Sequence, residues 1–333
     1  MRYIIYGAGG VGGVVGGKLH LAGFEVVLIA RGRHLELLQR DGLGLKHPNP
    51  DATETLPIPV VSHPSEIAFR DGDVALLTMK SQDTAAALDD LRLAAGDQIP
   101  VVCLQNGVEN ERLALRRFAH VYGVLVIMPA NYVEPGIVDT TSWPRVGVLD
   151  IGRYPVGTDA FTDRFVADMT RADFASEANP KIMRLKYTKL NQNMVNALQA
   201  ILPPDADSKD IVDKARAEAE ACFAAAGIDW APTSEMMART KSTGGAPGGI
   251  GGGSWRGGST WQSIVRATGS SETDYINGEI VLLGHQHGVP VPVNEVLQLY
   301  VDRLARSKGE PGSVDIAELR SEIARRESRS QTA

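Results

Sequence analysis

One lysine and two asparagines are spaced so that a single helix face would present all three side chains. Asn193 and Asn196 lie four and seven residues after Lys189. Helical geometry places both asparagines within about 40° of the lysine. A lysine in a partly buried pocket has a lowered pKa and can donate a proton near neutral pH, while amides bind the oxygens of a small polar ligand. A surface lysine beside helix-face amides is the other interpretation.

A carboxylate is the next candidate for chemistry. Glu272 lies in the segment 270–278, at the predicted start of a helix. A carboxylate there stabilises the first turn through the helix dipole, and Ser270 or Ser271 would serve as the cap. Spacing alone does not separate this structural role from that of an active-site carboxylate.

A glycine pattern near the N-terminus predicts a dinucleotide site. The pattern consists of Gly7, Ala8, Gly9, Gly10, Val11 and Gly12. A strand-like run precedes it and a helical stretch follows it. In such a pattern the first glycine permits a tight turn, the second lets backbone approach a pyrophosphate, and the third lets the helix pack on the strand. The N–H groups and dipole at the helix start stabilise the phosphate charge. A glycine-rich turn without a ligand is the alternative.

The end of the second predicted strand indicates which nucleotide would bind. Sites for NAD usually carry Asp or Glu there, which binds the ribose 2′-hydroxyl group. This sequence has Arg31 instead, and the first carboxylate after the strand is Glu36. A guanidinium binds a 2′-phosphate through charge-assisted hydrogen bonds, whereas a carboxylate would repel it. The sequence therefore favours NADPH over NADH, with a solvated loop arginine as the other interpretation.

The elements that must position these residues follow from the hydrophobic pattern. Short β-branched runs separated by helix-length segments predict βαβ units and a parallel, doubly wound sheet. These runs are 3–6, 25–29, 73–77 and 100–104. Lys80 and Asn106 each follow such a run, at the strand end where doubly wound sheets bind ligands. Proline-punctuated pieces over 123–151 suit antiparallel strands at the edge of the sheet.

The second half of the chain has helical patterning. Apolar or alanine-rich segments of helical character are 182–201, 208–226, 272–287, 294–306 and 314–326. The expected fold class is α/β, with a Rossmann-type NADP-binding domain over 1–178 and a mostly α-helical substrate and catalytic domain over 179–333. Residues 244–258 contain nine glycines in fifteen positions, which predicts a mobile loop or a lid that closes over bound substrate.

Composition limits the class of protein. The 333 residues predict about two domains, and 43% hydrophobic with 22% charged residues is ordinary for a globular chain. The net charge of −6 argues against nucleic acid as the main partner. The two cysteines, Cys103 and Cys222, provide no disulfide framework or metal-ligand cluster, and they favour a cytoplasmic location. Apolar runs are shorter than about 18 residues, and a signal-peptide pattern is absent, so no membrane is expected as partner.

Taken in chain order, the motifs of this sequence resemble those of the ketopantoate reductase (2-dehydropantoate 2-reductase) family over essentially the whole chain. The segments that carry the resemblance are 7–12, 28–34, 79–82, 104–109, 189–193 and 272–278. The resemblance implies NADPH-dependent reduction of 2-dehydropantoate (ketopantoate) to pantoate, a step toward pantothenate and coenzyme A. The expected partner is a small 2-oxo acid, and a homodimer is one expected assembly.

The resemblance also implies roles for individual residues. Lys189 matches the general acid that protonates the developing alkoxide, Asn193 a substrate-binding amide, and Glu272 a carboxylate that orients cofactor and lysine. The positions that match cofactor contacts are Lys80, Asn106 and Ala130, and those that match substrate contacts are Asn106 and Thr260.

Three departures from the family's pattern concern the substrate. The family's second asparagine corresponds to Ala197, and Asn196 stands one residue earlier. Thr260 and Trp261 replace a usual Ser-Met pair, and the glycine-rich stretch before them resembles an insertion. A related NADP-dependent oxidoreductase acting on another 2-oxo acid is therefore one alternative. A non-catalytic NADP(H)-binding sensor is another, although it would need no lysine acid.

Overall fold

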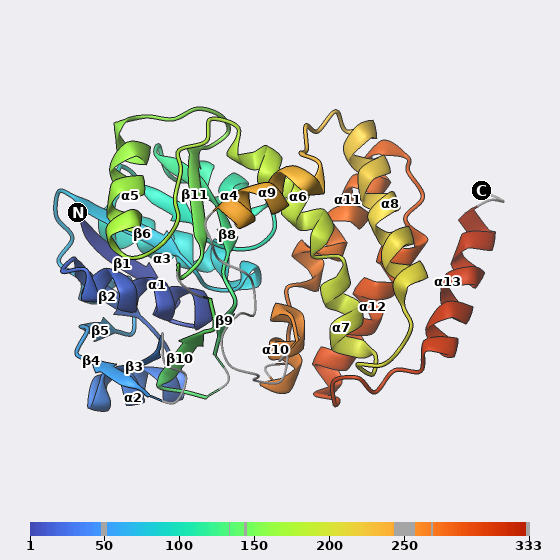
Figure 1. The fold of residues 1–333 in the computed structure, drawn as a ribbon, viewed down its shortest axis with the longest axis horizontal. Helices are drawn as coiled ribbons and strands as arrows, with labels where there is room; N and C mark the ends of the chain where they lie inside the picture. The colour runs from blue at the N-terminus through green and yellow to red at the C-terminus, as the bar shows by residue number, and fades with distance from the viewer. Residues whose placement is uncertain (48–51, 133, 143–144, 243–256, 268, 331–333) are drawn as a thin grey trace. The chain divides into compact units, whose positions relative to one another are not determined.

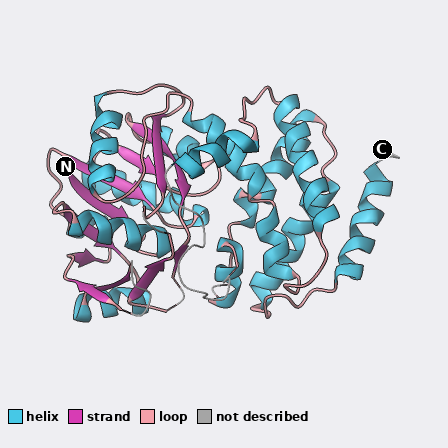
Figure 2. Cartoon of the chain, viewed as in Figure 1, coloured by secondary structure: helices cyan, strands magenta, loops and turns pink. Residues whose placement is uncertain are grey.

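The computed structural model of the protein describes most of the chain. The described residues are 1–47, 52–132, 134–142, 145–242, 257–267 and 269–330. The chain forms two compact units, the first comprising 1–186 with 232–253 and the second 187–231 with 254–333 (Figure 1). Among the described residues, strands occur only in the first unit (Figure 2). Except for its last two glycines, the predicted loop 244–258 lies outside the described residues.

The first unit is built on a seven-stranded sheet with the order β11-β8-β7-β6-β1-β2-β5. Its strands are β1 (Arg2–Tyr6), β2 (Glu25–Ile29), β5 (Val60–Val61), β6 (Asp73–Leu77), β7 (Val101–Cys103), β8 (Val121–Ile127) and β11 (Val148–Arg153). All neighbours are parallel except β8 and β11, which pair antiparallel at the edge. Strands β6 and β7 are buried throughout, as in a parallel sheet covered on both faces. The order of the parallel strands confirms the predicted Rossmann-type sheet.

A second sheet in this unit joins segments that lie far apart in the chain. Its order is β4-β3-β10-β9. The strands are β3 (Leu43–Lys46), β4 (Glu54–Leu56), β9 (Ala130–Asn131) and β10 (Ile137–Thr140). Strand β10 runs parallel to β3, with Ile137 opposite Gly44. The sequence does not predict this sheet, because local patterning does not show which distant strand will pair.

Helices surround the sheets of the first unit. They are α1 (Gly10–Leu21), α2 (Gly32–Asp41), α3 (Thr84–Ala95), α4 (Asn110–Leu115), α5 (Ala160–Arg171) and α9 (Thr233–Ser242), with 3-10 turns η1 (Pro64–Glu66) and η2 (Ser81–Asp83). Helix α1 packs tightly on the sheet, because a Cβ on Gly16 would lie only 2.9 Å from Leu28 Cδ2. Helix α9 is held on β11 by Arg239, whose Nε and Nη2 lie 2.8 and 2.6 Å from the Asp150 carboxylate oxygens. These side chains are only 15% and 3% exposed, so the contact is a buried, bidentate ion pair.

The second unit is helical, as predicted. Its helices are α7 (Val195–Ile201), α8 (Lys209–Ala225), α10 (Ser259–Val265), α11 (Asn277–His287), α12 (Pro292–Ser307) and α13 (Ile316–Ser330), and α6 (Ile182–Gln192) begins in the first unit. The prediction of one helix over 182–201 is wrong in one respect, since α6 ends before Asn193 and α7 begins after Met194. The Asn196 N–H donates to the Asn193 carbonyl at 2.9 Å. This three-residue spacing tightens the turn, and side chains three residues apart in such a turn lie over one another, so Asn193 and Asn196 stay on one side of the chain.

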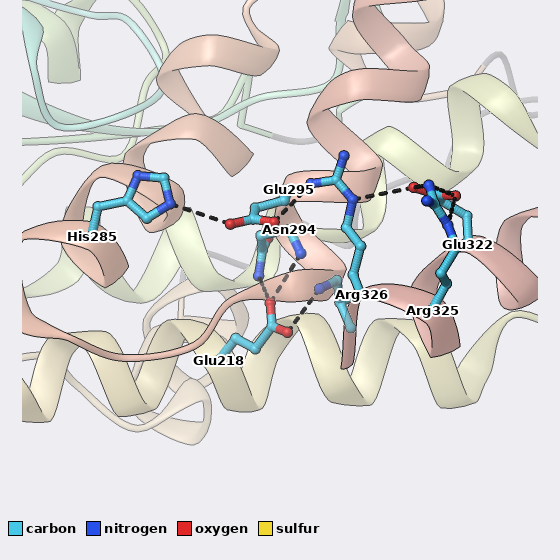
Figure 3. Close-up of polar contacts among 8 residues, drawn as sticks. Glu218, His285, Asn294, Glu295, Glu322, Arg325 and Arg326 are labelled. Atoms are coloured by element: carbon cyan, nitrogen blue, oxygen red, sulfur yellow. Dashed lines mark hydrogen bonds and ion pairs between the residues drawn. The ribbon is translucent and has the colours of Figure 1, made fainter. Parts of the chain in front are cut away.

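A carboxylate from α8 completes the start of α12 (Figure 3). Glu218 accepts hydrogen bonds from the backbone N–H groups of Val293 and Asn294 at 2.8 and 2.9 Å, and from Asn294 Nδ2 at 2.7 Å. Pro292 begins the helix and has no N–H group, so these bonds satisfy donors that a helix start leaves without intrahelical partners. Burial raises the pKa of Glu218 to about 7, against the lowering effect of these hydrogen bonds.

The last helix has a buried apolar side and is joined to α12 by a charged contact. Leu319 and Ile323 of α13 are buried. Arg326 of α13 places Nη1 2.7 Å from Glu295 of α12 and Nε 3.2 Å from Glu322 of its own helix (Figure 3). The 314–326 helix predicted from the sequence thus exists and continues to Ser330.

Candidate active site

The turn between β1 and α1 contains glycines for two different reasons. Gly7 has a φ of +106°, and a Cβ there would lie 2.6 Å from the Met79 backbone nitrogen. A Cβ on Gly12 would lie 2.3 Å from the Gly7 carbonyl oxygen. The protein itself therefore excludes side chains at both positions. Gly9 has an ordinary φ of −73°, and the nearest atom to its Cβ position is a Tyr132 ring carbon at 3.8 Å. The protein would thus accept a Cβ at Gly9 in ordinary van der Waals contact, so its own packing does not require glycine there, which fits the backbone approach of a pyrophosphate.

The N-terminus of α1 has donors for such a phosphate. Its N-cap residue is Gly9, which has no side chain to cap the helix, and Gly10 and Val11 begin the first turn. The first N–H groups of a helix have no intrahelical acceptors, and together with the dipole they attract anions. Ala130 of β9 lies beside this turn, since a Cβ on Gly10 would be 3.3 Å from the Ala130 carbonyl oxygen. The structure thus brings Ala130 next to the predicted phosphate loop.

A histidine from α2 fixes the backbone of the turn. The Gly136 N–H donates to His34 Nδ1 at 2.9 Å, so the proton of the neutral ring is on Nε2. Nε2 lies 2.7 Å from the Ala8 carbonyl oxygen and donates to it. Burial lowers the pKa of His34, which keeps the ring neutral, and the ring packs 4.7 Å from that of Tyr132. The sequence does not predict this role of His34, because the contact depends on where α2 crosses the turn.

One buried asparagine joins the loops that carry Lys80 and Asn106. Asn110 is fully buried, and its Nδ2 donates to Ser81 Oγ at 3.1 Å and to the Asn106 carbonyl oxygen at 3.2 Å. Its Oδ1 accepts from Thr84 Oγ1 at 2.8 Å. Ser81 directly follows Lys80, so the structure brings these two candidates to neighbouring strand ends, after β6 and β7. Both candidate side chains are half-buried.

A buried ion pair supports the Asn106 loop from α6. Lys186 Nζ lies 2.5 Å from Glu111 Oε1 and donates to the Gln105 carbonyl oxygen at 3.1 Å. The two charged side chains are 3% and 0% exposed. Because Gln105 precedes Asn106, this pair holds the backbone next to a candidate ligand contact. The sequence does not predict this ion pair, since the partners lie 75 residues apart.

Arg31 lies where the sequence predicts a contact to the 2′-phosphate. It is the N-cap residue of α2, two residues after the end of β2, and its side chain is 83% exposed. Its Nη2 donates to Asp83 Oδ2 at 2.6 Å. The guanidinium is therefore accessible to a ligand, but it already has an anionic partner.

Lys189 and Asn193 keep their predicted spacing at the end of α6. The Asn193 N–H donates to the Lys189 carbonyl at 2.9 Å, one helical turn back. Both side chains are half-buried. Asn193 Nδ2 is buried and has no hydrogen-bond partner among the described residues. An unsatisfied buried donor costs about 1–3 kcal/mol, which fits a position whose acceptor belongs to a ligand.

Asn196, in α7, lies beside the start of α10. Its Oδ1 lies 2.9 Å from the position that a Cβ on Gly258 would occupy. Gly258 is the N-cap residue of α10, and Thr260 in the first turn is 6% exposed. The structure thus brings Asn196 and Thr260 to the same end of α10. Ala197, at the position of the expected second asparagine, is buried at 1% exposure.

Glu272 has a different structural setting from the expected one. It is the N-cap residue of the 3-10 turn η3 (Thr273–Tyr275), and α11 begins only at Asn277. Its side chain makes no capping hydrogen bond, although it is only 6% exposed. The prediction that Glu272 lies in the first turn of an α-helix is therefore wrong, because the chain turns once more before α11.

Two sequence models of one family match the two parts of the chain. "Ketopantoate reductase PanE/ApbA" matches residues 3–155, and "Ketopantoate reductase PanE/ApbA C terminal" matches residues 181–304. The chain belongs to the ketopantoate reductase family. The family predicted from the motifs is thereby confirmed.

Individual proteins show how closely this ketopantoate reductase family member resembles others. A 2-dehydropantoate 2-reductase from Pyrococcus horikoshii is 32% identical over 206 residues, which are 61% of this chain and 64% of that protein, so the match spans less than two thirds of the relative. The crystal structure of a PanE/ApbA family ketopantoate reductase from Ralstonia eutropha JMP134 is 28% identical, with a TM-score of 0.76 over 92% of this chain and 99% of that one. A ternary structure of D-mandelate dehydrogenase with NADH and anilino(oxo)acetate has a TM-score of 0.78 over 92% and 99% of the two chains, and at 23% identity this shows a common fold.

Two further observations describe this ketopantoate reductase family member. In the described part of the chain, no group of three or more His, Cys, Asp or Glu side chains is arranged to hold a metal ion. The described helices include none that is both long and apolar enough to span a membrane.

Proposed function

We propose that this protein reduces 2-dehydropantoate to pantoate with NADPH, as a step of pantothenate biosynthesis. The observation that carries the proposal is the buried Asn193 Nδ2, which lacks a partner among the described residues one helical turn after Lys189. A 2-oxo acid offers the missing acceptor through its carboxylate or carbonyl oxygen. The same molecule then has its carbonyl near the proposed acid.

The first unit has the features that a dinucleotide requires. The protein's own packing does not require glycine at position 9, the N-terminus of α1 has no side-chain cap, and the Arg31 guanidinium is exposed. These features support residues 1–178 as the NADP-binding domain, with Lys80, Asn106 and Ala130 as additional contacts. Bound NADPH would supply the hydride that reduces the C2 carbonyl of the substrate.

The second unit carries the residues that we propose for substrate and proton transfer, within the domain 179–333. Lys189 acts as general acid and protonates the alkoxide that develops at C2, a contribution of about 10²–10⁴-fold to the rate. Glu272 orients the lysine and the cofactor. Asn193, Asn196 and Thr260 bind substrate oxygens.

A cofactor-oxidation assay tests this proposal. The purified protein is given NADPH and a panel of 2-oxo acids that differ in size and branching, and the loss of reduced nicotinamide is followed by absorbance. Lys189→Ala should lower kcat by about 10²-fold or more and leave the Kd of NADPH unchanged. Lys209→Ala is the matched control, because Lys209 is an 81% exposed lysine of the same unit. A Lys189→Ala variant with more than a third of the normal kcat would mean that another residue is the acid.

A different 2-oxo acid is the second candidate substrate. Ala197 is buried and apolar at the position where the family resemblance expects an amide. The site therefore has one hydrogen-bonding group fewer there, which favours a less hydroxylated substrate than ketopantoate. In the panel, a higher kcat/KM for an unhydroxylated 2-oxo acid would select this candidate. Cofactor binding without turnover of any panel member would favour a non-catalytic NADP(H) sensor.

Two wider features belong to the same proposal. Cys103 and Cys222 are both free and buried, which supports a cytoplasmic location, since reduced thiols are the normal state there. A homodimer is the proposed assembly, and sedimentation velocity of the purified protein tests it.

A further inference from the structure

We propose that Asp83 is a cofactor-specificity residue. Its carboxylate competes with the 2′-phosphate of NADPH for Arg31, and this lowers the affinity for NADPH relative to that for NADH. The inference rests on the proposed function, because it concerns the adenosine end of the dinucleotide site. It adds a residue that opposes the selectivity supplied by the arginine.

The first observation is that the Asp83 carboxylate does not serve its own helix. Asp83 is the N-cap residue of α3, a position where aspartate usually accepts the N–H groups of the first turn. Its side chain makes no capping hydrogen bond. Oδ2 instead accepts from Nη2 of Arg31, 52 residues away in the chain. The Asp83 carboxylate thus forms an ion pair with Arg31 and does not cap α3.

The second observation is where this pair lies on the sheet. Tyr6 at the end of β1 is in register with the last residues of both β2 and β6. Arg31 follows β2 and Asp83 follows β6, so the ion pair connects the two strand ends that flank β1. The phosphate turn 7–12 begins at that same end. A dinucleotide with its pyrophosphate on the turn has its adenosine ribose near the end of β2.

The charges of the pair act differently on the two cofactors. A 2′-phosphate is a dianion that needs the Arg31 guanidinium, and Asp83 is the only side-chain partner of that guanidinium among the described residues. The phosphate must therefore displace the carboxylate or bind beside it against like-charge repulsion. The ribose of NADH carries a hydroxyl group at this position. A carboxylate accepts a hydrogen bond from it without any conflict of charge.

Binding measurements on a charge-removing variant test the role of Asp83. Asp83→Asn keeps the shape of the side chain, and isothermal titration calorimetry gives the Kd of NADPH and of NADH. We expect the Kd of NADPH to fall by about fivefold and that of NADH to change by less than about twofold. Asp83→Ser is a second, smaller variant and should shift the Kd of NADPH in the same direction.

Asp89→Asn is the matched control. Asp89 lies on the same helix, is 61% exposed, and its Oδ1 is 2.6 Å from Nε of Arg117, so this variant also removes one acid from an arginine pair. It should leave both dissociation constants unchanged. Unchanged NADPH affinity in Asp83→Asn, or an equal change in the control, would overturn the specificity role alone. Failure of the wild-type protein to bind either dinucleotide would overturn the proposed function and this inference together.

Discussion

Replacing Lys186 by methionine should destabilise the first unit strongly. The ammonium group is 3% exposed and the Glu111 carboxylate is 0% exposed, and 2.5 Å separates Nζ from Oε1. Glu111 Oε2 already lacks a hydrogen-bond partner among the described residues. Lys186→Met would therefore leave a buried carboxylate with no compensating charge, which costs about 3–5 kcal/mol. The exposed pair of Lys209 and Asp213 provides the comparison, since losing such a pair costs at most about 1 kcal/mol.

Urea unfolding followed by circular dichroism measures this cost, with Lys209→Met as the exposed control. A double variant, Lys186→Met with Glu111→Gln, separates the charge from the packing. The double variant removes both charges, so it should recover most of the lost free energy of unfolding. A loss below about 1 kcal/mol in Lys186→Met, or a double variant no more stable than the single one, would refute the reasoning.

Three other perturbations give distinct readouts. Gly9→Ala should raise the Kd of NADPH by about tenfold at an unchanged melting temperature. Gly12→Ala should instead cost about 1–3 kcal/mol of stability, because its Cβ would meet the Gly7 carbonyl oxygen. Calorimetry and thermal melts of both variants check these two results. Glu272→Gln should lower kcat more than about tenfold while the melting temperature moves by only a few degrees, and normal turnover with a lowered melting temperature would assign Glu272 a structural role. The pKa of Glu218 is raised by burial from 4.5 to about 7, so the stability that this group contributes is fully present below pH 4.5 and is lost as the pH rises to about 7. Urea unfolding across this pH range should show the wild type losing up to about 1.4 kcal/mol per pH unit relative to Glu218→Gln, and parallel curves would contradict it.

Sequence was most informative where structure depends on neighbouring residues. The strand–glycine–helix unit around Gly9 and the alternation of β-branched runs are local patterns, and both predicted the Rossmann-type sheet. The pairing of β10 with β3 depends on contacts between distant segments, which no local pattern encodes. The break between α6 and α7 also was not predicted, because the residues at the break are Asn193 and Met194, and neither is a proline or glycine that would indicate the end of a helix.

The candidate site shows the same division. The spacing of Lys189 and Asn193 follows from one helical turn, and this part of the pattern was readable in the sequence. The partners of Arg31 and Ala8 were not readable, because Asp83 and His34 reach them across the fold. Each of these contacts joins side chains from different elements, and therefore depends on how helices pack over the strand ends.

The position of α9 determines how this protein can be divided experimentally. The chain leaves the first unit after residue 186 and returns to it at 232, so a single cut cannot release the first unit intact. A fragment ending at 186 would retain Asp150, whose side chain is 3% exposed, without its bidentate partner Arg239. Such a fragment should be poorly folded even though it contains every strand of the sheet. Domain-exchange chimeras within the family therefore need both segments of the unit from the same parent.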